Sequence, residues 1–575
     1  MIKTHIITHC HTDLSNGTTN IDSVTKYQEY VDRCVEEGMT AIAFTEHGNM
    51  FNWLYKKEYC ESKGIKYIHG IEMYVTKSLD EKVRDNYHTC MYAKNFEGVK
   101  ELNKLVSKAY NREDNHFYYV PRISFEELKN TSDNILIATA CIGGGLRPNS
   151  EIKEEYIKFL SENKHRCFLE VQHHLVNVQA EYNREMVDLS HITGVPLILG
   201  TDTHALNETH VKGRSILQKA KNIHFENEDG WDISFRTLDE LKLMYKTQGA
   251  LTEEQFMEAV KNTHVLADMV EEFEVDKQYK YPKLYEDSLS VLKQKINEGI
   301  IRRGVNKYPN YNEYIDRIKV ELEAYQHNKA VDYLLLDEGL KTEAREIGIE
   351  PGPSRGSVSG SIIAYLIGMT DMDSIKRNLN FERFMNTARV SLADVDTDWP
   401  PTRREEVKNL LYSKDKLYCS EIVTFNTVKL KGSIRDVGRA LNMDLQIVNE
   451  ICKNIEDDEQ KYREQYPELF EYVDIISGTV VSLGIHPCGT IVSPIPLDEN
   501  VGLITTTTTD KPISMLNMNE INDLFYVKLD VLGLENVELI NDTCELAGIE
   551  RVTPDNVPDD ENVWKAIRDN TLGMW

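Results

Sequence analysis

The chain has 575 residues, of which 41% are hydrophobic, and its formal net charge is −28. A chain of this length can bury several cores, so we expect roughly three or four domains. No apolar run approaches the roughly 20 residues that a membrane-spanning helix needs, and the charge alone argues against non-specific binding to nucleic acid. The ten cysteines are scattered without a CxxC pair and no secretory signal precedes the first strand-like run, so we expect reduced thiols and a cytoplasmic protein without membrane contact.

Potential metal ligands recur along the first 204 residues, each within or directly after an apolar, strand-like run. Helix-like stretches such as 24–37 and 95–110 separate the runs, and this alternation predicts a largely parallel α/β sheet. Histidine is the commonest metal ligand, and 14 of the 17 histidines lie before residue 225. One such histidine alone is more often structural, but their recurrence at strand ends indicates a site. The residues are His9, His11, Glu46, His47, Glu72, His88, Cys141, Glu170, Asp202 and His204.

These segments resemble the PHP phosphoesterase domain. The resemblance rests on THCH at 8–11, TEHGNMF at 45–51, GIEMYV at 70–75, ACIGG at 140–144 and TDTH at 201–204. It implies a distorted βα barrel that binds a cluster of up to three metal ions, usually zinc or manganese. Carried over by position, the implied metal ligands are His9, His11, His47, Glu72, His88, Cys141, Asp202 and His204.

The chain departs from the PHP pattern at two places. Glu46 stands where the family usually has aspartate, and the acidic or histidine residue expected shortly after the HxH pair has only Asp13 or Asn16 as candidates. The implied chemistry is hydrolysis by metal-activated water, which could extend to 3′→5′ trimming of DNA. The alternative is a domain in which the metal is purely structural.

A second candidate site lies at Ser391–Trp399, SLADVDTDW, which contains Asp394, Asp396 and Asp398. In a strand these three carboxylates would share one face, and they would repel each other unless a cation lay between them. Hard oxygen ligands of this kind suit Mg²⁺, although an acidic turn has the same composition. The glycine-rich segment Glu350–Gly368 lies upstream, and its glycines followed by a helix N-terminus would suit a triphosphate.

The order of motifs GPSRGSVSGS, FERFMN, ADVDTDW, VTFNTV, IRDVGR, IHPCGTIVSP and VKLDVLGL resembles the C-family of bacterial replicative DNA polymerases, the alpha subunits of DNA polymerase III. The resemblance runs from the first residue to the last. It implies a palm similar to the nucleotidyltransferase fold of DNA polymerase beta, whose catalytic, metal-binding aspartates fall on Asp396, Asp398 and Asp530. It places Asp394 outside this triad. These carboxylates would hold two Mg²⁺ ions for nucleotidyl transfer.

Nucleotide and DNA contacts are implied around this triad. By position they fall on Arg355, Gly356, Ser357 and Lys528. In addition, Lys431, Arg435 and Arg439 are spaced four apart, so on a helix they would form one basic face for the triphosphate or the DNA backbone. A solvated helix face is the ordinary alternative. Arg383 and Arg389 are weaker candidates.

The resemblance also divides the chain. We expect a PHP domain with a connector over 1–275, a palm over 276–400 and 505–550, a helical thumb over 401–504 and the start of the fingers over 551–575. The family's remaining fingers, clamp-binding region and OB-fold are not in this sequence. The implied function is template-directed DNA synthesis from dNTPs on primer-template DNA, with a separate C-terminal polypeptide that supplies the fingers and the contact with a sliding clamp. The alternatives are a stand-alone PHP phosphoesterase or nuclease, and an inactive scaffold.

Overall fold

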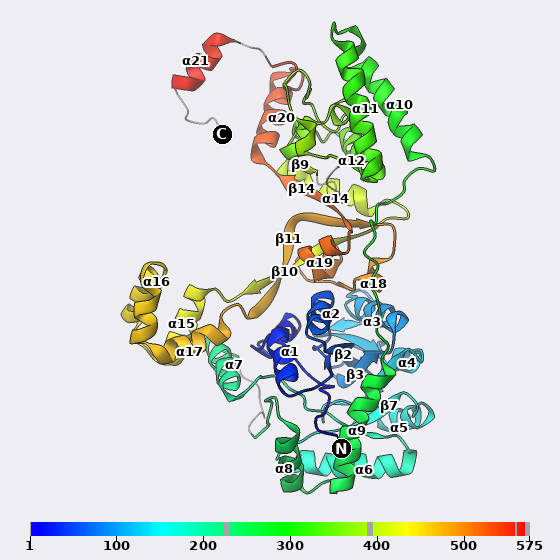
Figure 1. Ribbon diagram of the computed structural model, residues 1–575, viewed down its shortest axis with the longest axis vertical. Helices are drawn as coiled ribbons and strands as arrows, with labels where there is room; N and C mark the ends of the chain where they lie inside the picture. The colour runs from blue at the N-terminus through cyan, green and yellow to red at the C-terminus, as the bar shows by residue number, and fades with distance from the viewer. Residues whose placement is uncertain (1, 224–229, 388–394, 558–559, 570–575) are drawn as a thin grey trace. The chain divides into compact units, whose positions relative to one another are not determined.

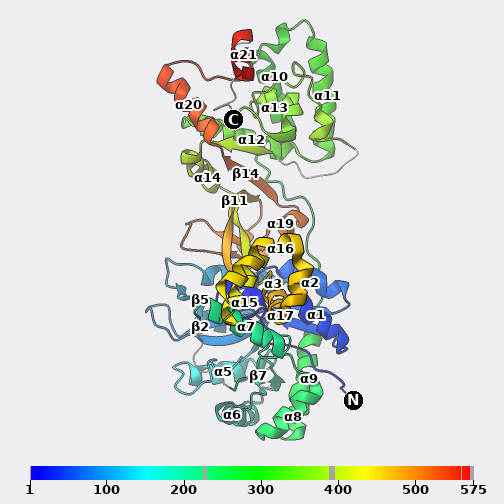
Figure 2. The same ribbon diagram turned by 90° about the vertical axis from the view of Figure 1, so that its left-hand side faces the viewer.

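The computed structural model describes residues 2–223, 230–387, 395–557 and 560–569 (Figures 1 and 2). The expected sites Asp394 and Arg389 lie outside these residues. The chain forms two compact units, and each is described by itself. Unit 1 contains Met1–Val275, Val423–Ile485 and Asp498–Glu520, and unit 2 contains Asp276–Ile422, His486–Leu497 and Ile521–Trp575. Within the described residues, no helix combines the length and the apolar character needed to cross a membrane.

A curled sheet forms the centre of unit 1. Its strands are β1 (Ala41–Phe44), β2 (Lys66–Thr76), β3 (Tyr87–Ala93), β4 (Phe117–Tyr118), β5 (Val120–Ser124), β6 (Ile135–Ala138), β7 (Cys167–Val171) and β8 (Leu197–Leu199). They follow the order β4-β5-β2-β3-β6-β7-β8, with β1 also paired to β2. The segment before β1 pairs with both β1 and the residues that follow β8. Ile7 forms a bridge with Ile42 of β1, and Cys10 forms a bridge with Thr203. This arrangement is the expected distorted α/β barrel, in the form of a curled half-barrel.

The directions of the strands differ in part from the prediction of a largely parallel sheet. The pairs β1–β2, β2–β5, β6–β7 and β7–β8 are parallel, but β3 runs antiparallel to both β2 and β6. The physical reason is the connection 77–86, which contains no helix, whereas a parallel neighbour needs a long crossover. The reversal brings the start of β3, which carries His88, to the edge where the parallel strands end.

Most of the helices of residues 1–275 lie around this sheet (Figure 1). The helices described there are α1 (Tyr27–Glu36), α2 (Trp53–Ser62), α3 (Phe96–Ala109), α4 (Phe125–Lys129), α5 (Lys153–Glu162), α6 (Asn177–Thr193), α7 (Glu208–Ala220), α8 (Leu238–Gln248) and α9 (Glu253–Met269). Helix α3 shows why they form: Asn95 caps its start, and Val99, Leu102 and Val106 are buried along one face. Apolar residues at this spacing bind a helix to a sheet.

The helices expected to form a thumb belong to unit 1. They are α15 (Leu430–Ala440), α16 (Leu445–Gln465) and α17 (Pro467–Ile476), and both views show α15 and α17 beside α7. Leu217 of α7 shares a buried cluster with Ile434 and Val437 of α15. Lys221 forms an ion pair with Asp436 at 3.1 Å. The helices therefore pack on the N-terminal unit, and the expected thumb segment 401–504 is divided between the two units.

Unit 2 surrounds a short parallel strand pair. Its elements are α10 (Ser288–Arg302), α11 (Tyr311–His327), α12 (Val331–Glu346), α13 (Ile362–Ile367), β9 (Asp396–Trp399), α14 (Arg404–Tyr412), β14 (Val527–Gly533), α20 (Glu535–Ala547) and α21 (Glu561–Asp569). Strand β9 pairs with β14 in parallel. A buried core that includes Leu334, Ile363, Trp399 and Leu529 joins the strands to the helices.

The remaining strands and short helices complete both units. Strands β10 (Tyr418–Thr427) and β11 (Val480–Ser493) each run from one unit into the other. In unit 2, β11 pairs antiparallel with β14 over Gly489–Val492. In unit 1, β12 (Leu503–Ile504) pairs antiparallel with β13 (Ile513–Asn517). The short helices are α18 (Leu497–Asn500) and α19 (Met518–Asp523).

Candidate metal centre and carboxylate site

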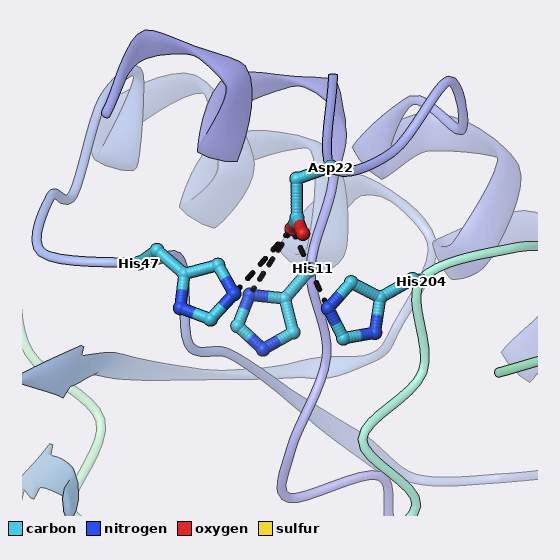
Figure 3. Close-up of side chains that lie close together, drawn as sticks. All are labelled: His11, Asp22, His47 and His204. Atoms are coloured by element: carbon cyan, nitrogen blue, oxygen red, sulfur yellow. Dashed lines mark ion pairs between the residues drawn. The ribbon is translucent and has the colours of Figure 1, made fainter. Parts of the chain in front are cut away.

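Three histidines and an aspartate from distant parts of unit 1 meet at one edge of its sheet. The Asp22 Oδ2 atom lies 3.9 Å from His11 Nδ1, 3.6 Å from His47 Nε2 and 3.4 Å from His204 Nε2. Figure 3 shows the three imidazoles grouped around this carboxylate. Each residue offers one ligand atom, and these four atoms lie within 4.8 Å of one another. The spacing is that of a group that could hold a metal ion.

Three further groups of candidate ligand atoms accompany the first, and one of them joins His9 and Glu72 to the buried Cys90, which the sequence argument did not name. Glu72 Oε2 lies 2.8 Å from His47 Nδ1, and Glu72 Oε1 lies 2.9 Å from His88 Nδ1. Asp202 Oδ1 lies 3.3 Å from His9 Nε2. The resulting groups His47–Glu72–His88 and His9–His11–Asp202 share members with the first group. Together they form one candidate centre that could hold more than one ion.

The chemistry of this centre fits a metal. Among the described residues, several of its ligand atoms are buried without a hydrogen bond: His9 Nε2, His11 Nε2, Asp22 Oδ2, His47 Nδ1 and Glu72 Oε2, the last two of which lie 2.8 Å apart without hydrogen-bond geometry. Such orphaned polar atoms destabilise a fold unless something compensates them, and cations bound in these groups would compensate them. Mixed imidazole and carboxylate ligands are typical of zinc and manganese sites.

The protonation states of the candidate ligands differ. Burial acts to lower the pKa of His47, but Tyr74, Asp22 and Glu72 raise that pKa well above its ordinary value, so His47 would have to release a proton on binding a metal. Burial, together with the neighbouring His47 and His204, lowers the pKa of His11 to about 4. His11 is therefore neutral at pH 7, as a ligand must be. Burial acts to raise the pKa of the Asp22 carboxyl, but His204 and His47 hold that pKa well below its ordinary value. Asp22 is therefore ionised.

The structure brings seven of the eight sequence-predicted ligands into these groups. They are His9, His11, His47, Glu72, His88, Asp202 and His204. The eighth, Cys141, borders them, with its Sγ atom 3.5 Å from His88 Nδ1. The sequence argument missed Asp22, which lies in a loop eleven residues after His11 without any local pattern.

The two residues expected in place of Asp22 have other roles. The Asp13 carboxylate accepts a hydrogen bond from the Val480 backbone N–H at 3.1 Å, and the Asn16 amide donates to the Val480 carbonyl at 2.7 Å. The expectation that one of them completes the centre is wrong, because both side chains point to the start of β11. Asp22 takes that place instead.

Glu46 is the other departure from the family pattern. It supports the loop that follows His9 and His11. It is 1% exposed, and its Oε1 atom lies 2.6 Å from Lys56 Nζ. It also accepts hydrogen bonds from the hydroxyls of Thr12 and Ser15, each at 2.6 Å. Burial acts to raise the pKa of Glu46, but the Lys56 ammonium holds it below its ordinary value. Glu46 is thus a paired, ionised residue that fixes this loop.

In unit 2 the three expected catalytic aspartates lie on two neighbouring strands. Asp530 of β14 is directly opposite Asp396 of β9 in the parallel register. Asp398 lies two residues further along β9, on the same face as Asp396. The side chain of Asp396 is 39% exposed, whereas those of Asp398 and Asp530 are 11% and 9% exposed. The three aspartates therefore share one face of the strand pair, which is most exposed at Asp396, although they are not among the described groups whose ligand atoms all lie within 4.8 Å of one another.

Two cations balance part of this negative charge. Arg355 Nη1 lies 2.9 Å from Asp398 Oδ1, and Arg355 Nε lies 3.9 Å from Asp396 Oδ2. Lys528 Nζ lies 2.7 Å from Asp530 Oδ2. The second oxygen of Asp530, Oδ1, is buried without a hydrogen-bond partner. Carboxylate oxygens are ligands that Mg²⁺ prefers, together with water or phosphate oxygens. The unpartnered Oδ1 atom of Asp530 could therefore bind such an ion.

The Gly-Ser loop borders these aspartates. Gly356 has a φ of +65°, a backbone conformation that favours glycine, and a Cβ atom there would lie 3.8 Å from Asp396 Oδ2. The loop forms a 3₁₀ turn, Gly356–Gly360, in which Ser357 is exposed. The backbone around Gly356 is thus the part of the loop that a ligand at Asp396 could approach.

The expected anion site at the start of the following helix is wrong. Helix α13 begins at Ile362, and the Glu321 carboxylate accepts hydrogen bonds from the backbone N–H groups of Ile362 and Ile363 at 2.9 and 3.0 Å. The Ser361 hydroxyl also donates to Glu321, at 2.8 Å. Because a buried carboxylate of the chain already occupies these donors, a triphosphate cannot use them.

The expected basic row lies on α15 of unit 1, whereas the aspartates lie in unit 2. Lys431 forms an ion pair with Glu456 at 2.8 Å. Arg439 donates a hydrogen bond to the carbonyl of Ala220 at 3.1 Å. Arg435 is exposed. Two of the three cations are therefore partly engaged within unit 1, and their role in binding nucleotide or DNA stays a prediction.

The fold and the two sites define an α/β protein that combines a PHP domain with a polymerase palm. The family model of the PHP domain matches residues 8–174. The model described as the bacterial DNA polymerase III alpha NTPase domain matches residues 290–533. The chain therefore contains segments similar to a PHP domain and to the bacterial DNA polymerase III alpha NTPase domain.

Individual relatives match nearly all of the chain. DNA polymerase III subunit alpha of Borreliella burgdorferi is 30% identical over 96% of this chain and 50% of its own length. The proteins of the same name from Treponema pallidum and Aquifex aeolicus are 29% and 28% identical, over 93% and 100% of this chain and 48% and 55% of their own lengths. The chain thus spans about half the length of these relatives. A solved histidinol phosphate phosphatase from Lactococcus lactis covers 38% of this chain and 95% of its own at 16% identity, but its TM-score of 0.20 supports no argument.

Proposed function

We propose that this chain provides the catalytic centre of a DNA-directed DNA polymerase, which adds dNTPs to a primer by nucleotidyl transfer. The observation that carries the proposal is the parallel register of β9 and β14, which sets Asp530 opposite Asp396 with Asp398 on the same face. Two Mg²⁺ ions held by these carboxylates would lower the pKa of the primer 3′-hydroxyl and stabilise the pyrophosphate leaving group.

The other residues of the site have distinct roles in this proposal. Arg355 and Lys528, which pair with Asp398 and Asp530, would turn to phosphate oxygens when the carboxylates bind metal. Gly356 lets the backbone approach the nucleotide closely, and Ser357 offers an exposed hydroxyl beside it. Primer-template DNA would bind with help from the basic row on α15.

We propose a second activity for the metal centre of unit 1. Its imidazole and carboxylate ligands suit Zn²⁺ or Mn²⁺, and a water bound there would hydrolyse phosphodiester bonds, including 3′→5′ trimming of DNA. A stand-alone PHP nuclease is less favoured, because the carboxylate site of unit 2 is present with its Gly-Ser loop. We further propose that the protein acts in the cytoplasm, and that a separate polypeptide supplies the fingers and the contact with a sliding clamp.

The test is primer extension on a gapped template with Mg²⁺. The chain is assayed alone and with a polypeptide that carries the fingers, and Asp396→Ala is the control. Extension that needs the partner and disappears in the variant supports the proposal. The contrary result is absence of extension in every mixture, with metal-dependent trimming that survives Asp396→Ala but is lost in His9→Ala. That result would leave the nuclease alone.

A further inference from the structure

One buried carboxylate beside the metal centre belongs to none of the groups of ligand atoms described above. Glu170 lies on β7, and its Oε1 atom is 2.7 Å from Nδ1 of His9. The side chains of both residues are fully buried. The other ring nitrogen of His9, Nε2, faces Glu72 Oε1 at 3.5 Å and Asp202 Oδ1 at 3.3 Å. His9 therefore has one nitrogen toward the candidate ligands and the other toward Glu170.

The structure holds the Glu170 carboxylate in place from several sides. The Gln172 amide donates a hydrogen bond to Glu170 Oε1 at 2.8 Å. The backbone N–H of Glu170 donates to the Thr139 hydroxyl at 2.9 Å. A Cβ atom at Gly200 would lie 2.0 Å from Glu170 Oε1, so only glycine leaves room for the carboxylate there. This is a built position for the carboxylate.

Among the five candidate histidine ligands, His9 differs in how its second nitrogen is held. His11 Nδ1 lies 3.2 Å from the Ser15 hydroxyl, and His204 Nδ1 lies 2.8 Å from the Asp202 carbonyl. His47 and His88 both direct Nδ1 to Glu72, which is itself a candidate ligand. Among these five histidines, His9 is therefore the one whose second ring nitrogen contacts a carboxylate that is not itself a candidate ligand.

We propose that Glu170 is a positioning residue of the metal centre, which acts through His9 on a bound divalent transition-metal ion. By accepting a hydrogen bond from Nδ1–H, it fixes the tautomer of His9 that presents the Nε2 lone pair to the ion. Its negative charge also makes the imidazole a stronger donor to the metal. The inference rests on the metal centre of the proposed function but does not depend on which reaction that centre catalyses.

The experiment measures metal affinity in the full chain. Zn²⁺ is titrated in competition with a chromophoric chelator, and Co²⁺ is used for a visible absorption spectrum. Glu170→Gln removes the charge, and Glu170→Asp keeps the charge but withdraws it from His9. Each is expected to weaken Zn²⁺ binding by roughly 10–100-fold and to shift the Co²⁺ spectrum, while the Tm of the metal-free protein stays near that of the wild type.

A second carboxylate–histidine pair in unit 1 gives a matched control. Glu127 lies 3.0 Å from Nε2 of the buried His116, away from the metal centre. Glu127→Gln should leave both the Zn²⁺ affinity and the Co²⁺ spectrum unchanged. If the Glu170→Gln variant does not fold, the Zn²⁺ affinity and Co²⁺ spectrum of Glu170→Asp provide the test.

Two results overturn the inference in distinguishable ways. Wild-type affinity and an unchanged Co²⁺ spectrum in a folded Glu170 variant would show that Glu170 does not act on the ion. Absence of Zn²⁺ and Co²⁺ binding in the wild type would remove the metal centre itself, and the inference with it.

Discussion

The metal centre of unit 1 and the carboxylate site of unit 2 both gather acidic side chains, but they balance the negative charge differently. In unit 1, buried carboxylates alternate with histidine imidazoles, and five of the ligand atoms described lack a hydrogen-bond partner. In unit 2, Asp396 is partly exposed and the chain's own Arg355 and Lys528 pair with the aspartates. A bound ion would satisfy the orphaned atoms of the first site, whereas two side chains of the chain itself already balance part of the charge of the second.

This difference indicates how each site should treat its metal. A buried site of imidazoles and carboxylates gains stability from a retained ion, because binding compensates atoms that otherwise lack a hydrogen bond. An open site of hard oxygen ligands can exchange Mg²⁺ together with the substrate phosphates. We therefore expect metal removal to affect the stability of unit 1 and the activity of unit 2.

The largest expected effect comes from Asp530→Asn. A two-metal site supplies several kcal/mol of transition-state stabilisation, so its loss should lower primer extension by roughly 10³-fold. The extension rate is measured in the presence of the polypeptide that supplies the fingers. The zinc or manganese content of the variant, measured by elemental analysis, should equal that of the wild type.

The matched control for Asp530→Asn is Asp316→Asn. Asp316 lies in unit 2 as well, but its side chain is 75% exposed and pairs with Lys319 on the same helix. Its replacement should leave extension unchanged. If Asp530→Asn kept extension within tenfold of the wild type, the carboxylate site would not be the catalytic one.

Sequence reasoning found the ligands that belong to local patterns. His9, His47 and Asp202 follow apolar runs directly, so the end of each run locates them. Asp396 and Asp398 alternate with Val395 and Thr397, and this period of two correctly predicts a strand with both carboxylates on one face.

Sequence reasoning failed where a residue of the site, or the hydrogen-bond partner of one, lies far away along the chain. Asp22 reaches the centre from an irregular loop, and Glu321 occupies the helix start at Ile362 from another helix 41 residues away. The reversed direction of β3 depends on a connection that lacks a helix, which the alternation of runs did not reveal. Such features depend on tertiary packing, which neither periodicity nor local composition specifies.

The next prediction tests whether the buried Glu46 carboxylate needs the Lys56 ammonium as its partner. Lys56→Met leaves the 1% exposed Glu46 carboxylate without its ammonium partner. An uncompensated buried charge should lower the free energy of unfolding by about 3–5 kcal/mol. Urea denaturation measures this change in the transition of unit 1.

Lys57→Met on the same helix is the control for Lys56→Met. Its partner Glu61 has a side chain that is 47% exposed, so the loss should be about 1 kcal/mol or less. Equal losses in the two variants would contradict the view that Glu46 needs its buried partner.

Metal removal should sharpen the contrast between the units. At a Zn²⁺ concentration about 100 times the Kd, binding stabilises the folded state by about 2.7 kcal/mol, and a chelator should remove that amount. Calorimetry should show the loss in unit 1, and Asp22→Asn should greatly reduce the effect of the chelator. Mg²⁺ should shift the Tm much less. An identical response of the wild type and the Asp22 variant would exclude Asp22 as a ligand.

A pH effect should also appear in unit 1. Burial raises the pKa of Glu520 to about 8 from an ordinary value of 4.5. Between these values the folded chain keeps a proton that the unfolded chain has released, so stability falls as pH rises, by up to about 1.4 kcal/mol per pH unit. Above the folded pKa the contribution levels off. Urea denaturation from pH 5 to 8 should show this slope, and Glu520→Gln should reduce it. An unchanged slope in the variant would assign the effect to other groups.

The smallest expected effect concerns the basic row on α15. Arg435 is exposed, whereas Arg439 donates a hydrogen bond to the Ala220 carbonyl. If the row contacts a DNA backbone, Arg435→Ala should reduce the slope of log affinity against log salt by about 1. Arg439→Ala should reduce it less, because its guanidinium already has a partner within unit 1. Fluorescence anisotropy with a primer-template duplex across a salt series measures both slopes. Two unchanged slopes would make α15 a solvated helix that packs on α7, and would leave DNA binding to unit 2.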